Sequence, residues 1–312
     1  MADKIPTRDG FGKRIVELGK DNEKIFVMSA DLEDATRAEY FRDAYPKRFM
    51  TVGIAEQDLV GTAVGLSMQG YIPVICSFAV FLTNRAYDMI RLDICYNDAN
   101  VKIVCSHAGV TVGQDGASAQ CLEDFALMRV LPRMRVVCPV DAIEAKKATD
   151  AIISADGPMY MRTSRGAFPV ITKESDPFEI GKGVVLREGT DATVIACGIM
   201  VSSALEAAES LAKENISVNV INMHTIKPID TDLIVAAAQQ TGAIVTAEEH
   251  QVYGGLGGAV VEVLAQHYPV PVEMVAVQDT FGQTGAPQEL LDEYHLSPRD
   301  IVAAVRKAVK RK

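Results

Sequence analysis

Short apolar runs alternate with helical patterns along the whole chain, and this alternation constrains the fold more than any other feature of the sequence. Such a rhythm is typical of parallel β-sheets that helices cover on both faces. In the first part of the chain the strand candidates are residues 25–29, 49–54, 72–77, 101–106, 135–140 and 159–163, and the helix candidates are 81–96, 122–131 and 142–154. We therefore predict an α/β protein with mainly parallel sheets.

A polar segment with Pro177 near its end, residues 173–178, interrupts this rhythm and is typical of a linker. A second α/β series follows it, with strand candidates at 184–186, 192–197, 218–222, 243–248 and 272–277. The 312 residues suit two domains. We predict a first domain over 1–172, a linker over 173–183 and a second domain over 184–312. Each domain is expected to be a mainly parallel sheet flanked by helices.

Composition bears on nucleic-acid binding, on membrane insertion and on the state of the cysteines. The net charge of −10 provides no basic surface for nucleic acid. No apolar run has the length of a membrane span, and the first residues lack an apolar signal region. The cysteines have no metal-type spacing, and most lie in apolar runs, so we expect buried thiols in a reducing cytoplasm. They are Cys76, Cys95, Cys105, Cys121, Cys138 and Cys197.

A lone carboxylate, Glu56, stands at the start of an apolar helix that is expected to end near Gly70. A buried carboxylate is costly unless another group pairs with it. The alternative is an ordinary acidic helix start. Three other polar or aromatic segments, residues 29–32, 77–81 and 106–116, also lie at or after predicted strand ends. Ligand sites of α/β sheets lie at such ends.

The segment Gly53-Ile54-Ala55-Glu56-Gln57 resembles the "GIxEQ" element of the transketolase family of thiamine-diphosphate enzymes. The order and spacing of the four segments resemble the pyrimidine-binding half of these enzymes, and the resemblance covers nearly the whole chain. It implies a pyrimidine-binding domain followed by a transketolase C-terminal domain. It also implies transfer of a two-carbon ketol unit from a ketose phosphate to an aldose phosphate.

The resemblance assigns cofactor roles to four residues. Glu56 matches the catalytic glutamate that hydrogen-bonds the aminopyrimidine ring of thiamine. Asp31 matches an aspartate that lies near thiamine. Phe78 and Phe81 match the aromatic residues that flank the pyrimidine, a use that suits rigid rings. The alternative for the two phenylalanines is ordinary core packing.

Substrate-binding roles fall on four further residues. His107 matches a histidine that contacts the sugar phosphate, and Asp115 matches an aspartate that contacts substrate hydroxyls. Arg165 and Arg8 match two phosphate-binding arginines. A guanidinium suits this task because its planar fork makes two hydrogen bonds to phosphate oxygens. The alternative for Arg8 is a solvated charge.

The family's second half-site is missing from this sequence. It contains a Gly-Asp-Gly motif and a later asparagine, which hold Mg²⁺ and the diphosphate, and the chain has no such motif. The resemblance therefore covers only the C-terminal half of a transketolase. It implies a partner subunit that carries the diphosphate-binding domain with Mg²⁺ or Ca²⁺, and a heterotetramer of two plus two chains.

Two departures from the family pattern affect the expected substrate site. Ala119 stands where the family has a histidine that contacts the donor substrate, and Ala35, followed by Thr36, stands where it has a phosphate-binding serine. They leave open a deoxyxylulose-phosphate-synthase-like enzyme, a 2-oxoacid dehydrogenase beta-like subunit and an inactive regulatory paralogue. His107 favours transketolase over the synthase, which has an arginine there. The segment 248–258, with its acidic pair and glycines, is expected to be a strand-to-helix turn outside the chemistry.

Overall fold

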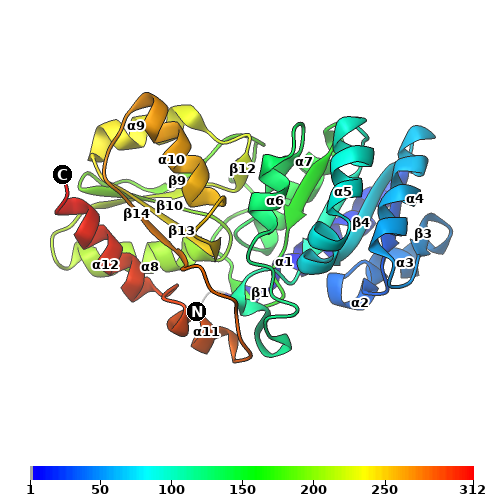
Figure 1. Cartoon of the computed structure of the whole chain (residues 1–312), viewed down its shortest axis with the longest axis horizontal. Helices are drawn as coiled ribbons and strands as arrows, with labels where there is room; N and C mark the ends of the chain where they lie inside the picture. Colours follow the sequence, from blue (N-terminus) through cyan, green and yellow to red (C-terminus); the bar gives the residue numbers. More distant parts are fainter. Residues whose placement is uncertain (1–2) are drawn as a thin grey trace.

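Two sheets lie side by side in the computed structural model, which describes residues 3–312 (Figure 1). The first sheet has the strand order β12-β6-β7-β5-β4-β2-β3. All its pairs are parallel except β12 with β6. Its strands are β2 (Ile25–Ser29), β3 (Phe49–Thr51), β4 (Ile72–Phe78), β5 (Lys102–Ser106), β6 (Arg135–Val137), β7 (Met159–Arg162) and β12 (Thr225–Lys227).

The second sheet has the order β14-β13-β10-β11-β9, and only β9 is antiparallel to its neighbour. Its strands are β9 (Val184–Arg187), β10 (Ala192–Ala196), β11 (Val218–Asn222), β13 (Ile244–Gln251) and β14 (Val272–Val277). The predicted fold class, two mainly parallel sheets flanked by helices, is confirmed.

Helices cover both faces of the first sheet because successive strand residues are apolar and point to opposite faces. Val74 and Cys76 of β4 share a cluster with Phe11 of α1, whereas Ile75 belongs to another with Leu59 of α4. One cluster takes side chains from α1 (Thr7–Asp21), α3 (Glu39–Ala44) and α7 (Ala142–Ser154). The other takes them from α4 (Glu56–Met68) and α6 (Asp124–Val130) and from two π-helical segments, η2 (Val80–Arg85) and η3 (Ile90–Tyr96).

The second sheet is covered in the same way. Val194 of β10 packs with α8 (Met200–Ala212) and α12 (Pro298–Val309), and Ile195 packs with α9 (Thr231–Thr241) and α10 (Leu256–His267). Smaller elements are α2 (Glu33–Thr36), α5 (Tyr87–Met89), α11 (Pro287–Glu293), the 3₁₀ segment η4 (Val110–Asp115), the 3₁₀ turn η1 (Pro46–Arg48) and the two-stranded ribbon of β1 (Lys4–Ile5) with β8 (Phe168–Pro169).

Some predicted elements differ in detail. The expected helix over 81–96 is a succession of η2, α5 and η3, so most of it is π-helical. The expected strand over 49–54 ends at Thr51, because Gly53 turns the chain with a φ of 74° and Ile54 is exposed. The strand β12 was not predicted: it comes from the second half of the chain but joins the first sheet.

A buried carboxylate, Glu144, also joins the two halves. It lies on α7, where its Oε2 accepts a hydrogen bond from the Val140 backbone at 2.7 Å. Its Oε1 accepts one from Asn222 Nδ2 of β11, also at 2.7 Å. Burial raises the pKa of Glu144 to about 8, and the charge of Asp141 acts in the same direction.

We expect Glu144 to make stability fall as the pH rises. Folding raises the pKa of this acid, so Glu144 contributes its full stabilisation of the folded state below the pKa that it has in the unfolded chain. That contribution is lost as the pH rises through the pKa of the folded state. Between pH 5 and 8 the wild type should lose about 1.4 kcal/mol per pH unit relative to Glu144→Gln. Urea unfolding at several pH values measures this loss. An equal slope in both proteins, with exposed Glu214→Gln as the control, would contradict the assignment.

Candidate active site

Glu56 is the first residue of α4 and only 1% exposed. Its Oε2 accepts a hydrogen bond from an Arg85 guanidinium nitrogen at 3.1 Å. Its Oε1 is buried and has no partner among residues 3–312. Because a buried carboxylate oxygen without a donor is costly, this atom is suited to a donor from a bound molecule. Glu56 thus begins the predicted helix, and it is buried, unlike an ordinary acidic residue at a helix start.

The residues of the candidate site follow neighbouring strands of the first sheet. Its order β7-β5-β4-β2-β3 brings the carboxyl ends of these parallel strands to one edge. The residues at this edge, taken along the sheet, are Arg165, His107, Phe78, Asp31 and Glu56. Asp31 is exposed and has a φ of 60°, and its backbone N–H donates to Thr51 Oγ1 at 3.3 Å.

A row of stacked rings joins the Glu56 region to His107. The rings of Phe78 and Phe81 lie 5.6 Å apart between centroids and 17° from parallel. The rings of Phe78 and His107 are 3.8 Å apart and 14° from parallel. The Arg85 guanidinium lies 5.5 Å from the centroid of the Phe81 ring, so it contacts both the row and Glu56. Phe78 and Phe81 thus stack on one another beside His107 and Arg85, and their role next to a cofactor stays a prediction.

His107 is buried and uncharged at neutral pH. It has a φ of 56°, and its Nδ1 lies 2.8 Å from Ser106 Oγ. Burial lowers the pKa of His107 to about 3, and the charges of Arg8, Arg165 and Arg37 act in the same direction. A neutral imidazole keeps one nitrogen as donor and one as acceptor. His107 can therefore hydrogen-bond a substrate without adding charge.

Arg8 retains donors for an anion. One terminal nitrogen donates to the Ala35 carbonyl at 2.6 Å, while its Nε is buried and has no hydrogen-bond partner among residues 3–312. Burial and the charges of Arg37 and Arg165 lower the pKa of Arg8. Like charges held near one another favour binding of an anion between them. Arg8 is therefore a half-buried arginine and not a fully solvated charge, and its phosphate-binding role stays a prediction.

Arg165 and Asp115 lie together at the loop that follows His107. Arg165 donates to the Val112 carbonyl, and it lies 3.7 Å from Asp115 Oδ1. Both side chains are about one-third exposed. Arg8 and Arg165 both lie near enough to His107 for their charges to lower its pKa. The structure thus places all four predicted substrate residues in one region.

Two residues of this site, Arg85 and Arg37, were not predicted from the sequence. Arg85 follows Phe81 by four residues, which is the spacing of neighbours on a helical surface, so this signal was available. Arg37 pairs with Asp9 at 2.7 Å and has a φ of 66°. Nothing in its local sequence indicates that it approaches Arg8.

The two departures from the family pattern have structural consequences. Ala35 supplies its backbone carbonyl to Arg8. Thr36 does not replace the absent serine, because its buried hydroxyl donates to the Leu32 carbonyl at 2.8 Å. Ala119 is buried, and its neighbour Gln120 donates to the Val110 carbonyl at 3.1 Å.

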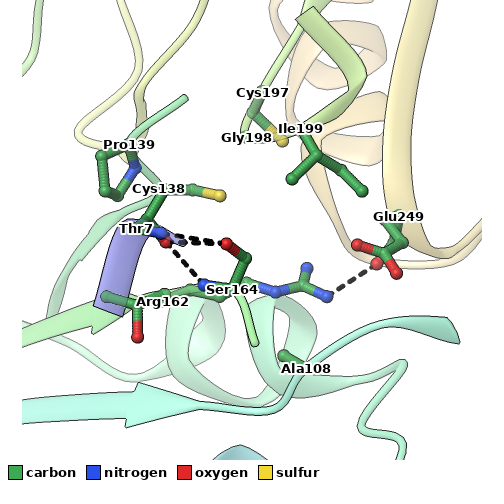
Figure 2. Close-up of a pocket in the computed structure, with 11 residues that line it drawn as sticks. Thr7, Ala108, Cys138, Pro139, Arg162, Ser164, Cys197, Gly198, Ile199 and Glu249 are labelled. Atoms are coloured by element: carbon green, nitrogen blue, oxygen red, sulfur yellow. Dashed lines mark hydrogen bonds between the residues drawn. The ribbon is translucent and has the colours of Figure 1, made fainter. Parts of the chain in front are cut away.

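A small cavity of about 20 Å³ lies between the two halves (Figure 2). Its lining includes Cys138, Arg162, Cys197 and Glu249. Thr7, Ala108 and Ser164 also line it, and they directly adjoin Arg8, His107 and Arg165 in the sequence. The cavity therefore lies beside the candidate active site, and its volume suits a water molecule, not a sugar.

The other histidines and the cysteines differ in how far they are buried. His224 is buried and stacks on Phe178 at 4.2 Å, whereas His267 and His295 are exposed. All six cysteines are free and buried, as predicted. Within residues 3–312 no cluster of three or more His, Cys, Asp or Glu residues is arranged to hold a metal. In the same range, no helix combines the length and the apolar character that crossing a bilayer requires.

Two family descriptions match this chain. Residues 3–170 match the transketolase pyrimidine-binding domain, and residues 181–301 match the transketolase C-terminal domain. The chain belongs to the transketolase family. This membership agrees with the resemblance seen in the motifs around Glu56 and the other strand-end residues.

Several transketolase-family proteins match the chain over nearly its whole length. A putative transketolase C-terminal section from Methanocaldococcus jannaschii is 40% identical, covering 97% of this chain and 96% of that protein. A 6-deoxy-6-sulfo-D-fructose transketolase subunit, SqwH, from Clostridium sp. is 39% identical, and the match covers 98% of this chain and 95% of that protein. A solved structure described as a split gene transketolase, inactive beta4 tetramer, is 49% identical with a TM-score of 0.93, covering 99% of both chains.

Proposed function

We propose that this transketolase-family chain is the C-terminal subunit of a split transketolase that depends on thiamine diphosphate. The proposed reaction moves a two-carbon ketol unit from a ketose or ketose phosphate to an aldose or aldose phosphate. The observation that carries the proposal is the buried Glu56 carboxylate, whose Oε1 lacks a partner among residues 3–312 at the edge that also holds His107 and Arg165.

The residues present fit a thiamine pyrimidine ring. Glu56 offers a buried oxygen for a ring nitrogen, and Phe78 and Phe81 offer aromatic surface beside it. Asp31, at the same edge, is proposed to lie near the cofactor. Thiamine diphosphate, when bound, supplies the nucleophilic carbon that carries the two-carbon unit. Glu56 holds a proton at the ring nitrogen, and Arg85 orients the Glu56 carboxylate.

The substrate-binding group is proposed to be Arg8, His107, Asp115 and Arg165. The arginines supply charged donors for a substrate phosphate. His107 supplies a neutral hydrogen-bonding group, since its pKa of about 3 keeps it uncharged. Asp115 supplies an acceptor for substrate hydroxyls. Ala119 leaves the position of the family's histidine without an imidazole, so the sugar specificity is expected to differ from that of ordinary transketolases.

A second subunit is part of the proposal. The matched domains are the pyrimidine-binding and C-terminal domains of transketolase. We propose that an N-terminal subunit supplies the diphosphate-binding domain with Mg²⁺ or Ca²⁺, in a cytoplasmic heterotetramer of two plus two chains. The related solved structure is described as a split gene transketolase, inactive beta4 tetramer, and this description supports the proposed need for a partner.

The test of the proposal is reconstitution. We expect the purified chain alone to show no ketol transfer and to bind thiamine diphosphate weakly, and the mixture with the N-terminal subunit to turn over a ketose-phosphate donor. The physical reason is that the partner subunit is proposed to supply the ligands of the diphosphate and its metal. Turnover and cofactor binding are measured with each subunit alone and with both.

Two outcomes would contradict the proposal. Robust activity of this chain alone would exclude the split-subunit assignment. Inactivity of the reconstituted pair towards a panel of donors and acceptors, despite cofactor binding, would favour the inactive paralogue, for which the loss of the family's histidine at Ala119 is the supporting observation.

A further inference from the structure

The end of β13 makes three contacts with different parts of the molecule. Glu248 accepts hydrogen bonds from the backbone of Leu256 and Gly257, so it caps α10 within the second half. His250 reaches the first half, where its Nε2 accepts from the Ala126 backbone at 3.3 Å. Glu249 lies between them and points towards the loop that carries His107 and Asp115. The expected strand-to-helix turn therefore also contacts the candidate site.

The Glu249 carboxylate is hydrogen-bonded to the backbone of this loop. Its Oε1 accepts a hydrogen bond from the Thr111 backbone N–H. The carboxylate also lies directly against Gly109, where an added Cβ would stand 2.1 Å from its Cδ. Gly109 has a φ of 82°, which glycine adopts readily. A side chain at 109 would therefore exclude Glu249 from its present position.

The Arg162 guanidinium holds the backbone of Glu249 in place. Arg162 of β7 donates to the Glu249 carbonyl at 2.8 Å, as the dashed line in Figure 2 shows. Arg162 in turn lies 3.7 Å from Asp124 and stacks on the Phe125 ring at 4.6 Å. Burial raises the pKa of Glu249 to about 6, and Arg162 and the Thr111 N–H oppose that rise. At neutral pH the carboxylate is therefore mostly ionised and accepts a charge-assisted hydrogen bond.

A second segment of the C-terminal half holds the same loop from another side. Gln120 Nε2 donates to the Gln283 carbonyl at 2.9 Å as well as to Val110. Gly113 lies against Gly285 and Pro287, since a Cβ there would meet both at 3.4 Å. Residues of the second half thus contact the loop between His107 and Gln120 at more than one point.

We propose that Glu249 is a positioning residue: through Thr111 and Gly109 the second half of the chain sets the conformation of the loop that bears His107 and Asp115. Glu249 is not proposed to touch the reacting atoms. Its effect on catalysis rests on the proposed transketolase function, whereas its effect on the loop does not.

Hydrogen exchange of the loop tests the structural part. In Glu249→Ala the Thr111 N–H loses its acceptor, and a charge-assisted hydrogen bond of this kind corresponds to about ten- to a hundredfold in local opening. We expect exchange in peptides spanning residues 108–116 to accelerate by that factor. Glu249→Asp, which withdraws the carboxylate by one methylene, should act in the same direction. Glu249→Gln keeps an acceptor oxygen and should remain within a few-fold of the wild type.

The matched control is Asn222→Ala, which breaks the contact with Glu144 between the two halves but leaves the loop untouched. Unchanged loop exchange in the Ala and Asp variants of Glu249 would overturn the proposal. An equal acceleration in Asn222→Ala would also overturn it, because general loosening of the two halves would then be the cause.

Steady-state kinetics of the reconstituted enzyme test the consequence. We expect Glu249→Ala to raise KM for a phosphorylated donor about tenfold, with a smaller change in kcat, and Glu249→Gln to restore it. A fall in kcat alone, or no rescue by glutamine, would contradict a positioning role. If the wild-type pair is inactive, the proposed function fails, and hydrogen exchange still decides the role of Glu249 in the loop.

Discussion

Glu56→Gln is expected to lower turnover by ~10²–10⁴-fold, the usual contribution of a positioned proton-transfer group. Glutamine has nearly the same shape and can still accept from Arg85, so the fold should change little. It cannot exchange a proton with a ring nitrogen as a carboxyl group does. Turnover of the reconstituted pair measures the loss, and deuterium exchange at the reactive carbon of thiamine reports the affected step directly.

The control for this variant is Asp58→Asn, which removes an exposed carboxylate from the same first turn of α4. It should leave both turnover and exchange near the wild-type values. Unchanged exchange at the thiamine carbon in Glu56→Gln would remove Glu56 from the catalytic role. The buried Glu56 oxygen, which has no partner among residues 3–312, would then need another explanation.

Arg165→Ala should raise KM for phosphorylated substrates by about ten- to a hundredfold, because a hydrogen bond to a charged group contributes roughly 1.5–3 kcal/mol. Unphosphorylated analogues lack the group that Arg165 is proposed to hold, so their KM should change far less. His107→Ala should act in the same direction. Steady-state kinetics with paired phosphorylated and unphosphorylated donors measure the difference.

A suitable control is Arg91→Ala, which removes an exposed arginine of the first half whose ion-pair partner is Asp88. It should affect neither class of substrate. Equal losses with both classes in Arg165→Ala would mean that Arg165 holds the loop through Val112 and Asp115 and does not bind phosphate.

Much of the fold follows from local patterns. The apolar runs at Ile25–Ser29 and Val218–Asn222 are strands with the predicted bounds, and the helix Ala142–Ser154 also begins and ends where predicted. The two strands are almost fully buried, and the Asp141 side chain caps the start of the helix, so the sequence pattern and the final packing agree. The predicted domain boundaries remain a prediction.

The missed features depend on contacts between distant parts of the chain. The strand β12 has only three residues and gains its ladder from β6, about ninety positions earlier. Arg37 approaches Arg8 because Gly12 of α1 lets the backbone around Arg37 come close. Glu249 acts across the two halves. Such long-range pairings leave no periodic signal in the residues that make them.

The strand β12 has a consequence for how the chain could be divided. Although it follows the predicted linker, it covers the outer side of β6, and the Cys138 backbone N–H donates to the His224 carbonyl at 2.8 Å nearby. A fragment that stopped at the linker would leave β6 as a bare sheet edge, which invites pairing with other chains. The two halves are therefore joined by backbone hydrogen bonds, although the sequence predicts two domains. A chimaera in which one half came from a distant relative would have to preserve the pairing of β12 with β6.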